Sequence, residues 1–260
     1  MKNLERILAQ KARRNLGIGE IEPINDLEAI LRYRAKISII KKKLKGKISG
    51  MCSKKFDVAA IVINSTYSLG RQNFTLAHEY YHILHDNDFS KQSDIKEKSA
   101  NKFASFFLMP KEALEYQLME RKIEKKDQID IKDVLYFSNF FQISYLAVLV
   151  RLRYEEKLIT KAKFDELKDC NARDEALKHG FPEELYNSTN EEGKILSDYV
   201  EEAQLAHKNN KITDGKYEEV LIEGGFIDIV FGLDEGSDVK DGNIEDYIWY
   251  WLSIIIFMDR

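Results

Sequence analysis

The chain has 260 residues, of which 44% are hydrophobic and 32% are charged, and its formal net charge is −4. This composition is that of a globular protein of one or two domains with a sizeable core. The acidic balance argues against a general nucleic-acid binder, because phosphate contacts need clustered Lys and Arg. Two cysteines, Cys52 and Cys170, are too few for a disulfide framework or a four-thiolate zinc site.

The sequence predicts a cytoplasmic protein without membrane contact. Residues 1–17 alternate charged and apolar side chains and lack the apolar core of a signal peptide. No stretch approaches the roughly 20 apolar residues that span a bilayer. The aromatic tail 247–258 is shorter than such a span, and we interpret it as a buried closing element, with a protein interface as the alternative.

In chain order, the first elements predict a small sheet with flanking helices. Helices are predicted at 3–15 and after Pro23, the second capped by Asn25 or Asp26. Strands are predicted at 37–40, 46–52 and 56–64, from their β-branched and apolar residues. The third strand is mostly apolar, which indicates that it is buried.

The rest of the chain is predicted to be mostly helical. Helices are expected at about 73–85, 94–109, 112–125, 131–141, 145–157, 197–208 and 214–222. The fold class is therefore α+β and helix-rich, with a short β-sheet packed on the helix 73–85. We divide the chain into a core at 1–115, a helical pair at 116–165 packed on it, and a mostly helical C-terminal region at 166–260.

The segment His78-Glu79-Tyr80-Tyr81-His82 carries the chemistry. Two imidazoles four residues apart on a helix lie about 40° apart, on one face. Both can therefore reach one zinc ion at about 2.0–2.1 Å. Glu79 points to the adjacent side, where it can accept a proton from the metal-bound water and pass it to a leaving amine. The segment predicts a metal site with Glu79 as the base.

A catalytic zinc site needs a third protein ligand and one open position. The candidates that follow are His85, Asp86, Asp88, Asp94 and Glu97. We favour Glu97, because it shares a helix face with Asn101 and Ala104, and a carboxylate aimed inward must be paired or bound to metal. Asn101 is predicted to hold the N–H of a histidine ligand. His85 is expected to pack beside the site or to support a ligand from behind.

These residues resemble a known family. Phe74-Thr75-Leu76-Ala77-His78-Glu79-x-x-His82, then Glu97-x-x-Ala100-Asn101-x-Phe103-Ala104 and Leu108-Met109-Pro110, are similar to the ImmA/IrrE zinc metallo-endopeptidases. The resemblance is dense over residues 20–160. It implies a zincin-like core with His78, His82 and Glu97 as zinc ligands and Glu79 as the catalytic base. Many members have Leu and Gly where Tyr80 and Tyr81 stand. We therefore expect these two bulky aromatic side chains to narrow the substrate cleft or to change how the helix packs.

The resemblance also implies a biological setting. Such proteins are typically bacterial or phage-encoded, and they cleave a helix-turn-helix repressor to induce stress, phage or mobile-element genes. We therefore expect Zn²⁺ as cofactor and a protein substrate of this class. The alternative is a zinc-containing regulatory or antitoxin-type module that binds a repressor or toxin without cutting it.

Two further elements are given roles. The helices at 131–157 are interpreted as a scaffold or a docking surface, so we expect no direct DNA binding. The strand 56–64 precedes the metal helix, and such a strand can pair with an extended substrate. Ile61 and Ile63 on this strand are therefore predicted to contact the substrate.

Overall fold

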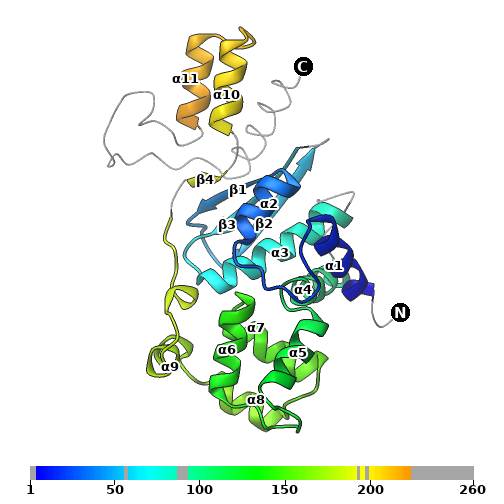
Figure 1. Ribbon diagram of the computed structural model, residues 1–260. Helices are drawn as coiled ribbons and strands as arrows, with labels where there is room; N and C mark the ends of the chain where they lie inside the picture. Colours follow the sequence, from blue (N-terminus) through cyan, green and yellow to red (C-terminus); the bar gives the residue numbers. More distant parts are fainter. Residues whose placement is uncertain (1–3, 56–57, 87–92, 192–193, 197–198, 224–260) are drawn as a thin grey trace.

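The computed structural model describes residues 4–55, 58–86, 93–191, 194–196 and 199–223. A four-stranded sheet lies beside helix α3, and most other helices gather on the far side of α3 (Figure 1). The strands are β1 (Ile37–Lys42), β2 (Gly50–Lys55), β3 (Val58–Asn64) and β4 (Lys194–Leu196). The predicted helix-rich α+β class is confirmed.

The helices account for most of the described residues. They are α1 (Leu4–Asn15), α2 (Leu27–Ala35), α3 (Leu69–His85), α4 (Asp94–Leu108), α5 (Lys111–Glu120), α6 (Ile131–Phe141), α7 (Tyr145–Val150), α8 (Lys161–Lys168), α9 (Ala172–Lys178), α10 (Tyr199–Lys208) and α11 (Asp214–Glu223). A π-helix, η1 (Arg151–Glu155), continues α7, and a 3₁₀ turn, η2 (Glu184–Tyr186), follows α9. The tail 247–258 lies outside the described residues.

Strand β3 is central in the sheet, whose order is β2-β3-β1-β4. It pairs with β1 in parallel and with β2 in antiparallel fashion. Both of its faces are covered, which explains the continuous apolar run. Ile61 and Ile63 belong to the main core with α3, whereas Ala60 and Val62 pack with residues of α10 and α11.

The prediction that β3 pairs with a substrate is therefore wrong. Both of its backbone edges already pair with neighbouring strands, and Ile61 and Ile63 are fully buried. Among the described strands, β2 and β4 form the two edges of the sheet, and β2 packs directly against α3. Any extended segment that adds to the sheet beside α3 would have to pair with β2.

Helices α3 and α4 are held together by aromatic side chains. Tyr80 is buried and lies with its ring centroid 6.4 Å from that of Phe103 and 5.8 Å from that of Phe107. Tyr81 packs on Phe103 at 5.4 Å. The two tyrosines that depart from the family pattern thus join the histidine-bearing helix to the helix that carries Glu97.

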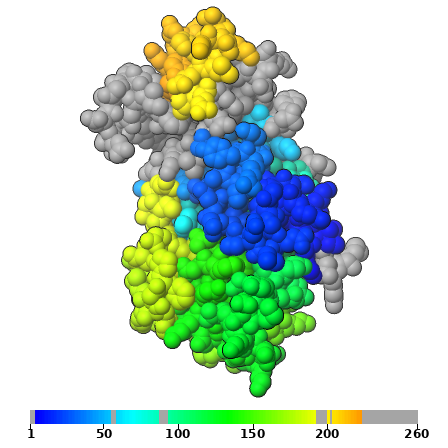
Figure 2. Space-filling view, in the orientation of Figure 1, coloured from blue at the N-terminus to red at the C-terminus, as the bar shows by residue number. Residues whose placement is uncertain are grey.

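The helical part beyond α4 is continuous with the core. Ser144 caps α7, since its Oγ accepts from the Ala147 N–H at 3.3 Å. One hydrophobic cluster extends from Ala9 to Ala176. The predicted domain limits near 115 and 165 fall inside α5 and α8. Figure 2 shows these helices at one end of the molecule and α10 and α11 at the other.

No single helix of the described chain is long and apolar enough to cross a membrane. Ile131–Phe141 and Tyr145–Glu155 meet the criteria of length and composition only as a pair, and this pair is bent by 112°.

Gly70 sets how closely α3 approaches the turn between α6 and α7. A Cβ at this position would lie 2.8 Å from the Ser144 backbone N and 3.0 Å from the Ile143 carbonyl carbon. We expect Gly70→Ala to lower the free energy of unfolding by about 1–3 kcal/mol, because backbone atoms must move. Gly215→Ala in α11 is the control, since nothing lies within 4 Å of its Cβ position. Equal denaturant midpoints for the two variants would contradict this account.

Candidate metal centre

Three side chains from α3 and α4 converge at the centre of the predicted site. The Nε2 atoms of His78 and His82 are 3.2 Å apart. One carboxylate oxygen of Glu97 lies 3.2 Å from His78 Nε2, and the other lies 3.5 Å from His82 Nε2. The edges of a tetrahedron with metal bonds of 2.0–2.1 Å are about 3.3–3.4 Å long. The spacing of these donors therefore fits a tetrahedral metal ion.

The outer nitrogens of both rings face acceptors. His78 Nδ1 lies 3.1 Å from Asn101 Oδ1, and His82 Nδ1 lies 2.9 Å from Asp86 Oδ2. In a neutral imidazole, the nitrogen that faces an acceptor carries the hydrogen, and the other keeps its lone pair. Both Nε2 lone pairs then point at each other and at the Glu97 carboxylate.

Such an arrangement of lone pairs is repulsive unless a cation lies between them. Two imidazole nitrogens and one carboxylate oxygen are also ligands that suit zinc. All three ligand atoms lie within 4.8 Å of one another. The residues of this site thus fit a divalent transition metal, with Asn101 and Asp86 orienting the rings from outside.

The other candidates for the third ligand have different surroundings. Asp86 contacts the outer nitrogen of His82 instead of the centre, and it also pairs with Lys96 at 3.3 Å. His85 packs on Tyr81 and Phe103 at ring distances of 4.8 and 6.0 Å, so it takes the packing role. Asp94 does not belong to the group, and Asp88 lies outside the described residues.

The Glu97 side chain is more exposed to solvent than we predicted from the small, apolar helix face on which it lies. Its side chain is 40% exposed, so the prediction of a buried, inward carboxylate is wrong in this respect. The helix α4 crosses beside the end of α3, and this crossing brings Glu97 over the two histidines. One side of the centre therefore remains open to solvent.

Glu79 directly follows His78 on α3 and lies on the adjacent side of the helix, facing strand β2. Its side chain is buried, and this burial raises the pKa of its carboxyl, while His78 and a hydrogen bond with Cys52 act in the opposite direction. Burial also raises the pKa of the Cys52 thiol, and Glu79 adds to that effect. The thiol therefore stays protonated and serves as the donor to Glu79.

The sequence did not indicate that Cys52 lies beside Glu79. The close approach of β2 to α3 produces this contact, and Gly50 marks where it occurs. A Cβ on Gly50 would lie 2.5 Å from Thr75 Cγ2 and 3.6 Å from Glu79 Cγ. A glycine inside a strand often marks such an approach, so Gly50 was the available signal.

Loss of the Asp86 carboxylate is expected to weaken metal binding without abolishing it. The group holds the outer nitrogen of His82, and removal of such a partner typically lowers metal affinity by about 10- to 100-fold. Titration of Asp86→Ala with zinc against a chromophoric chelator measures this change. Asp174→Ala, at a position on α9 away from the centre, is the control. An unchanged affinity in Asp86→Ala would contradict the orienting role.

Comparison with known proteins agrees with this geometry. Residues 33–153 match the family model Peptidase_M78, described as the IrrE N-terminal-like domain. This range includes β1 to β3, α3 and α4, and so the whole His-His-Glu group. No curated protein matches the chain.

Among solved structures, a Mycobacterium tuberculosis transcriptional regulator is similar at 16% identity and a TM-score of 0.41. That match covers 57% of this chain and 46% of the regulator, which is less than half of its length. The family resemblance predicted from the motifs is confirmed by the family model. Residues 33–153 of this chain therefore form a domain of the IrrE N-terminal-like, Peptidase_M78 type, as the ImmA/IrrE-like motifs predicted.

Proposed function

We propose that the protein is a zinc-dependent endopeptidase. The observation that carries the proposal is the convergence of His78, His82 and Glu97 at distances of 3.2–3.5 Å, with Glu79 on the adjacent side. Membership of the Peptidase_M78 family supports a peptidase-like centre. A structural zinc site would have no need of a further carboxylate, such as Glu79, that is not a ligand.

Each group has a defined task in this reaction. His78, His82 and Glu97 would hold the ion, and Asn101 and Asp86 keep the two rings oriented. A bound zinc ion supplies Lewis acidity, which polarises a carbonyl and lowers the pKa of water. Glu79 takes the proton of the attacking water on its carboxylate and delivers it to the leaving nitrogen.

The substrate main chain would bind along β2. Among the described strands, this strand is the sheet edge that packs against α3, next to Glu79. An extended segment can add to such an edge through main-chain hydrogen bonds. Strand β2 therefore takes the place of β3 in the substrate model.

We propose a transcriptional repressor of the helix-turn-helix class as the substrate, in the cytoplasm of a bacterium or in a phage-infected cell. Family membership supports this class, because the resemblance implies repressor cleavage and induction of stress, phage or mobile-element genes. Direct DNA binding and membrane contact are not part of the proposal.

The test is incubation of the zinc-loaded chain with the helix-turn-helix regulator encoded nearest to its gene. We expect two fragments whose masses sum to that of the regulator plus one water, and no fragments after chelation. Intact-mass spectrometry gives both readouts. A stable complex without fragments would contradict the peptidase and favour the non-cleaving regulatory module.

A further inference from the structure

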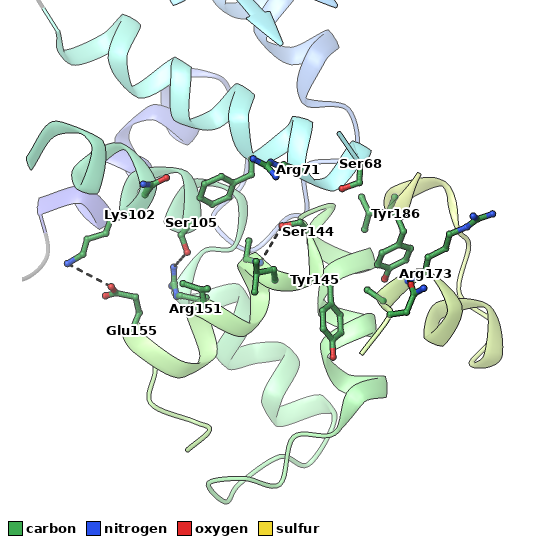
Figure 3. A pocket seen from close by; sticks show the side chains of 18 residues that line it. Ser68, Arg71, Lys102, Ser105, Ser144, Tyr145, Arg151, Glu155, Arg173 and Tyr186 are labelled. Atoms are coloured by element: carbon green, nitrogen blue, oxygen red, sulfur yellow. Dashed lines mark hydrogen bonds and ion pairs between the residues drawn. The ribbon is translucent and has the colours of Figure 1, made fainter. Parts of the chain in front are cut away.

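A groove lies between α3, α4 and α7, and Arg71, Ser105 and Ser144 are among the residues that line it (Figure 3). Its volume is about 760 Å³, within the range of sites that bind small ligands or side chains. Asn101 lines the groove and also holds the ring of His78. The groove and the metal centre are therefore adjacent, with Asn101 between them.

Apolar side chains form part of the groove walls. Leu146 and Val150 lie one turn apart on α7 and are 50% and 42% exposed. Phe74 lines the groove from α3, one turn before His78. A single exposed apolar residue needs no explanation, whereas a group of them beside a reactive centre marks a contact surface.

The charged residues of the groove are mostly basic. The lining contains Arg71, Lys102, Arg151, Arg173 and Glu155, in a chain whose formal net charge is −4. Figure 3 shows Lys102 and Arg151 toward one end of the groove and Arg173 toward the other. Arg151 and Arg173 are neutralised by Glu156 at 2.8 Å and Glu183 at 2.7 Å.

Arg71 differs from these cations, because no carboxylate of the described residues pairs with it. Its guanidinium lies over the Tyr67 ring at 3.6 Å and donates to Ser49 Oγ at 2.8 Å. Ser49 directly precedes strand β2. Arg71 therefore presents an exposed positive charge where the β2 edge meets the groove.

The distance from Arg71 to the metal centre can be given in substrate residues. Arg71 precedes His78 by two helical turns on the same face of α3, which corresponds to about 10 Å. An extended chain advances about 3.3 Å per residue. A side chain that meets Arg71 thus lies about three residues from the scissile bond.

We propose that this groove binds the substrate segment next to the scissile bond, with an apolar side chain between Phe74 and the Leu146–Val150 pair and an acidic side chain against Arg71. The inference rests on the proposed peptidase function and adds a sequence preference to it. The argument rests on the apolar walls, on the Arg71 cation, which pairs with no carboxylate of the described residues, and on Asn101, which lines the groove and contacts His78.

The test digests a synthetic peptide library with randomised positions, using the zinc-loaded full chain, and maps cleaved bonds by mass spectrometry. We expect Asp and Glu to be enriched about three residues to one side of the cleaved bond. Arg71→Glu should reverse this preference toward Lys and Arg by roughly three- to tenfold, as attraction becomes repulsion. Val150→Ser should weaken the apolar preference and leave the charge preference unchanged.

Arg14→Glu is the matched control, because Arg14 is an exposed arginine on α1 outside the groove. Cleavage by the wild type without an acidic preference, or an unchanged preference in Arg71→Glu, overturns the groove assignment and leaves the peptidase intact. A wild type that cleaves nothing refutes the proposed function instead. In that case, a binding measurement tests the groove assignment. Fluorescence anisotropy compares the affinities of two labelled peptides, which carry either Asp or Lys at the position that faces Arg71 and are otherwise identical. Equal affinities overturn it.

Discussion

Glu79→Gln is expected to lower the rate of peptide-bond hydrolysis by about 10²- to 10⁴-fold, the usual contribution of a positioned general acid–base group. The amide has nearly the same shape as the carboxylate, but it cannot take the proton of the attacking water. Glu79 faces β2 and lies outside the His-His-Glu group, so zinc content should stay unchanged. Single-turnover kinetics with the zinc-loaded variant, together with metal analysis, separate these two effects.

The control for this experiment is Glu115→Gln on α5, whose side chain is 61% exposed and pairs with Lys111. It should retain the wild-type rate. If zinc-replete Glu79→Gln cleaves the substrate within tenfold of the wild type, Glu79 is not the base. If the cellular response persists while cleavage is absent from both proteins, the non-cleaving module becomes the better account.

Removal of a ligand should have the second largest effect. Glu97→Ala and His82→Ala are each expected to reduce bound zinc from about one ion per chain to near zero, since two donors hold a labile ion poorly. The wild type should lose stability when zinc is chelated. Zinc at 100 times its dissociation constant contributes about 2.7 kcal/mol, or roughly 5–10 °C in melting temperature for a chain of this size.

Glu166→Ala serves as the matched control, because Glu166 is an exposed helical glutamate on α8 whose side chain is 65% exposed. Its zinc content and its melting shift on chelation should equal those of the wild type. Undiminished zinc in Glu97→Ala would remove Glu97 from the ligand set. Asp86 would then be the next carboxylate to test, since it already contacts His82.

Local features of the sequence predicted much of the fold. The helix after Pro23 begins where expected, with Asp26 accepting from the Ala29 N–H at 2.8 Å. Helix α6 has the predicted limits, because Asp130 and Asp133 form a capping box at its start. Helix α3 begins at Leu69, earlier than the start predicted near residue 73. Its N-cap, Ser68, makes no side-chain capping bond, so the usual start signal is weak there.

For the candidate metal centre too, local sequence features predicted some of the contacts and missed others. Spacing on one helix places His78 and His82 together, and a second helical face offers Glu97 and Asn101, so the sequence alone predicted which residue types meet a metal. Spacing could not show that Glu97 is 40% exposed, because this exposure depends on how α4 crosses α3. The contact of Asp86 with His82 is an i,i+4 contact at the end of α3, and only the structure shows that it is made to the outer ring nitrogen.

What the sequence determined by itself was periodic and local: the helices, the buried strand β3, and a histidine pair with a base between them. The order of the strands in the sheet, which the sequence did not reveal, decided which backbone edge is free beside α3. A run of apolar residues such as 58–64 does not reveal whether its backbone edges are free, because strand pairing joins residues distant in the chain. Only the tertiary structure makes β2 the edge beside Glu79, brings Cys52 to that carboxylate, and joins Arg71, Phe74 and Val150 in one groove.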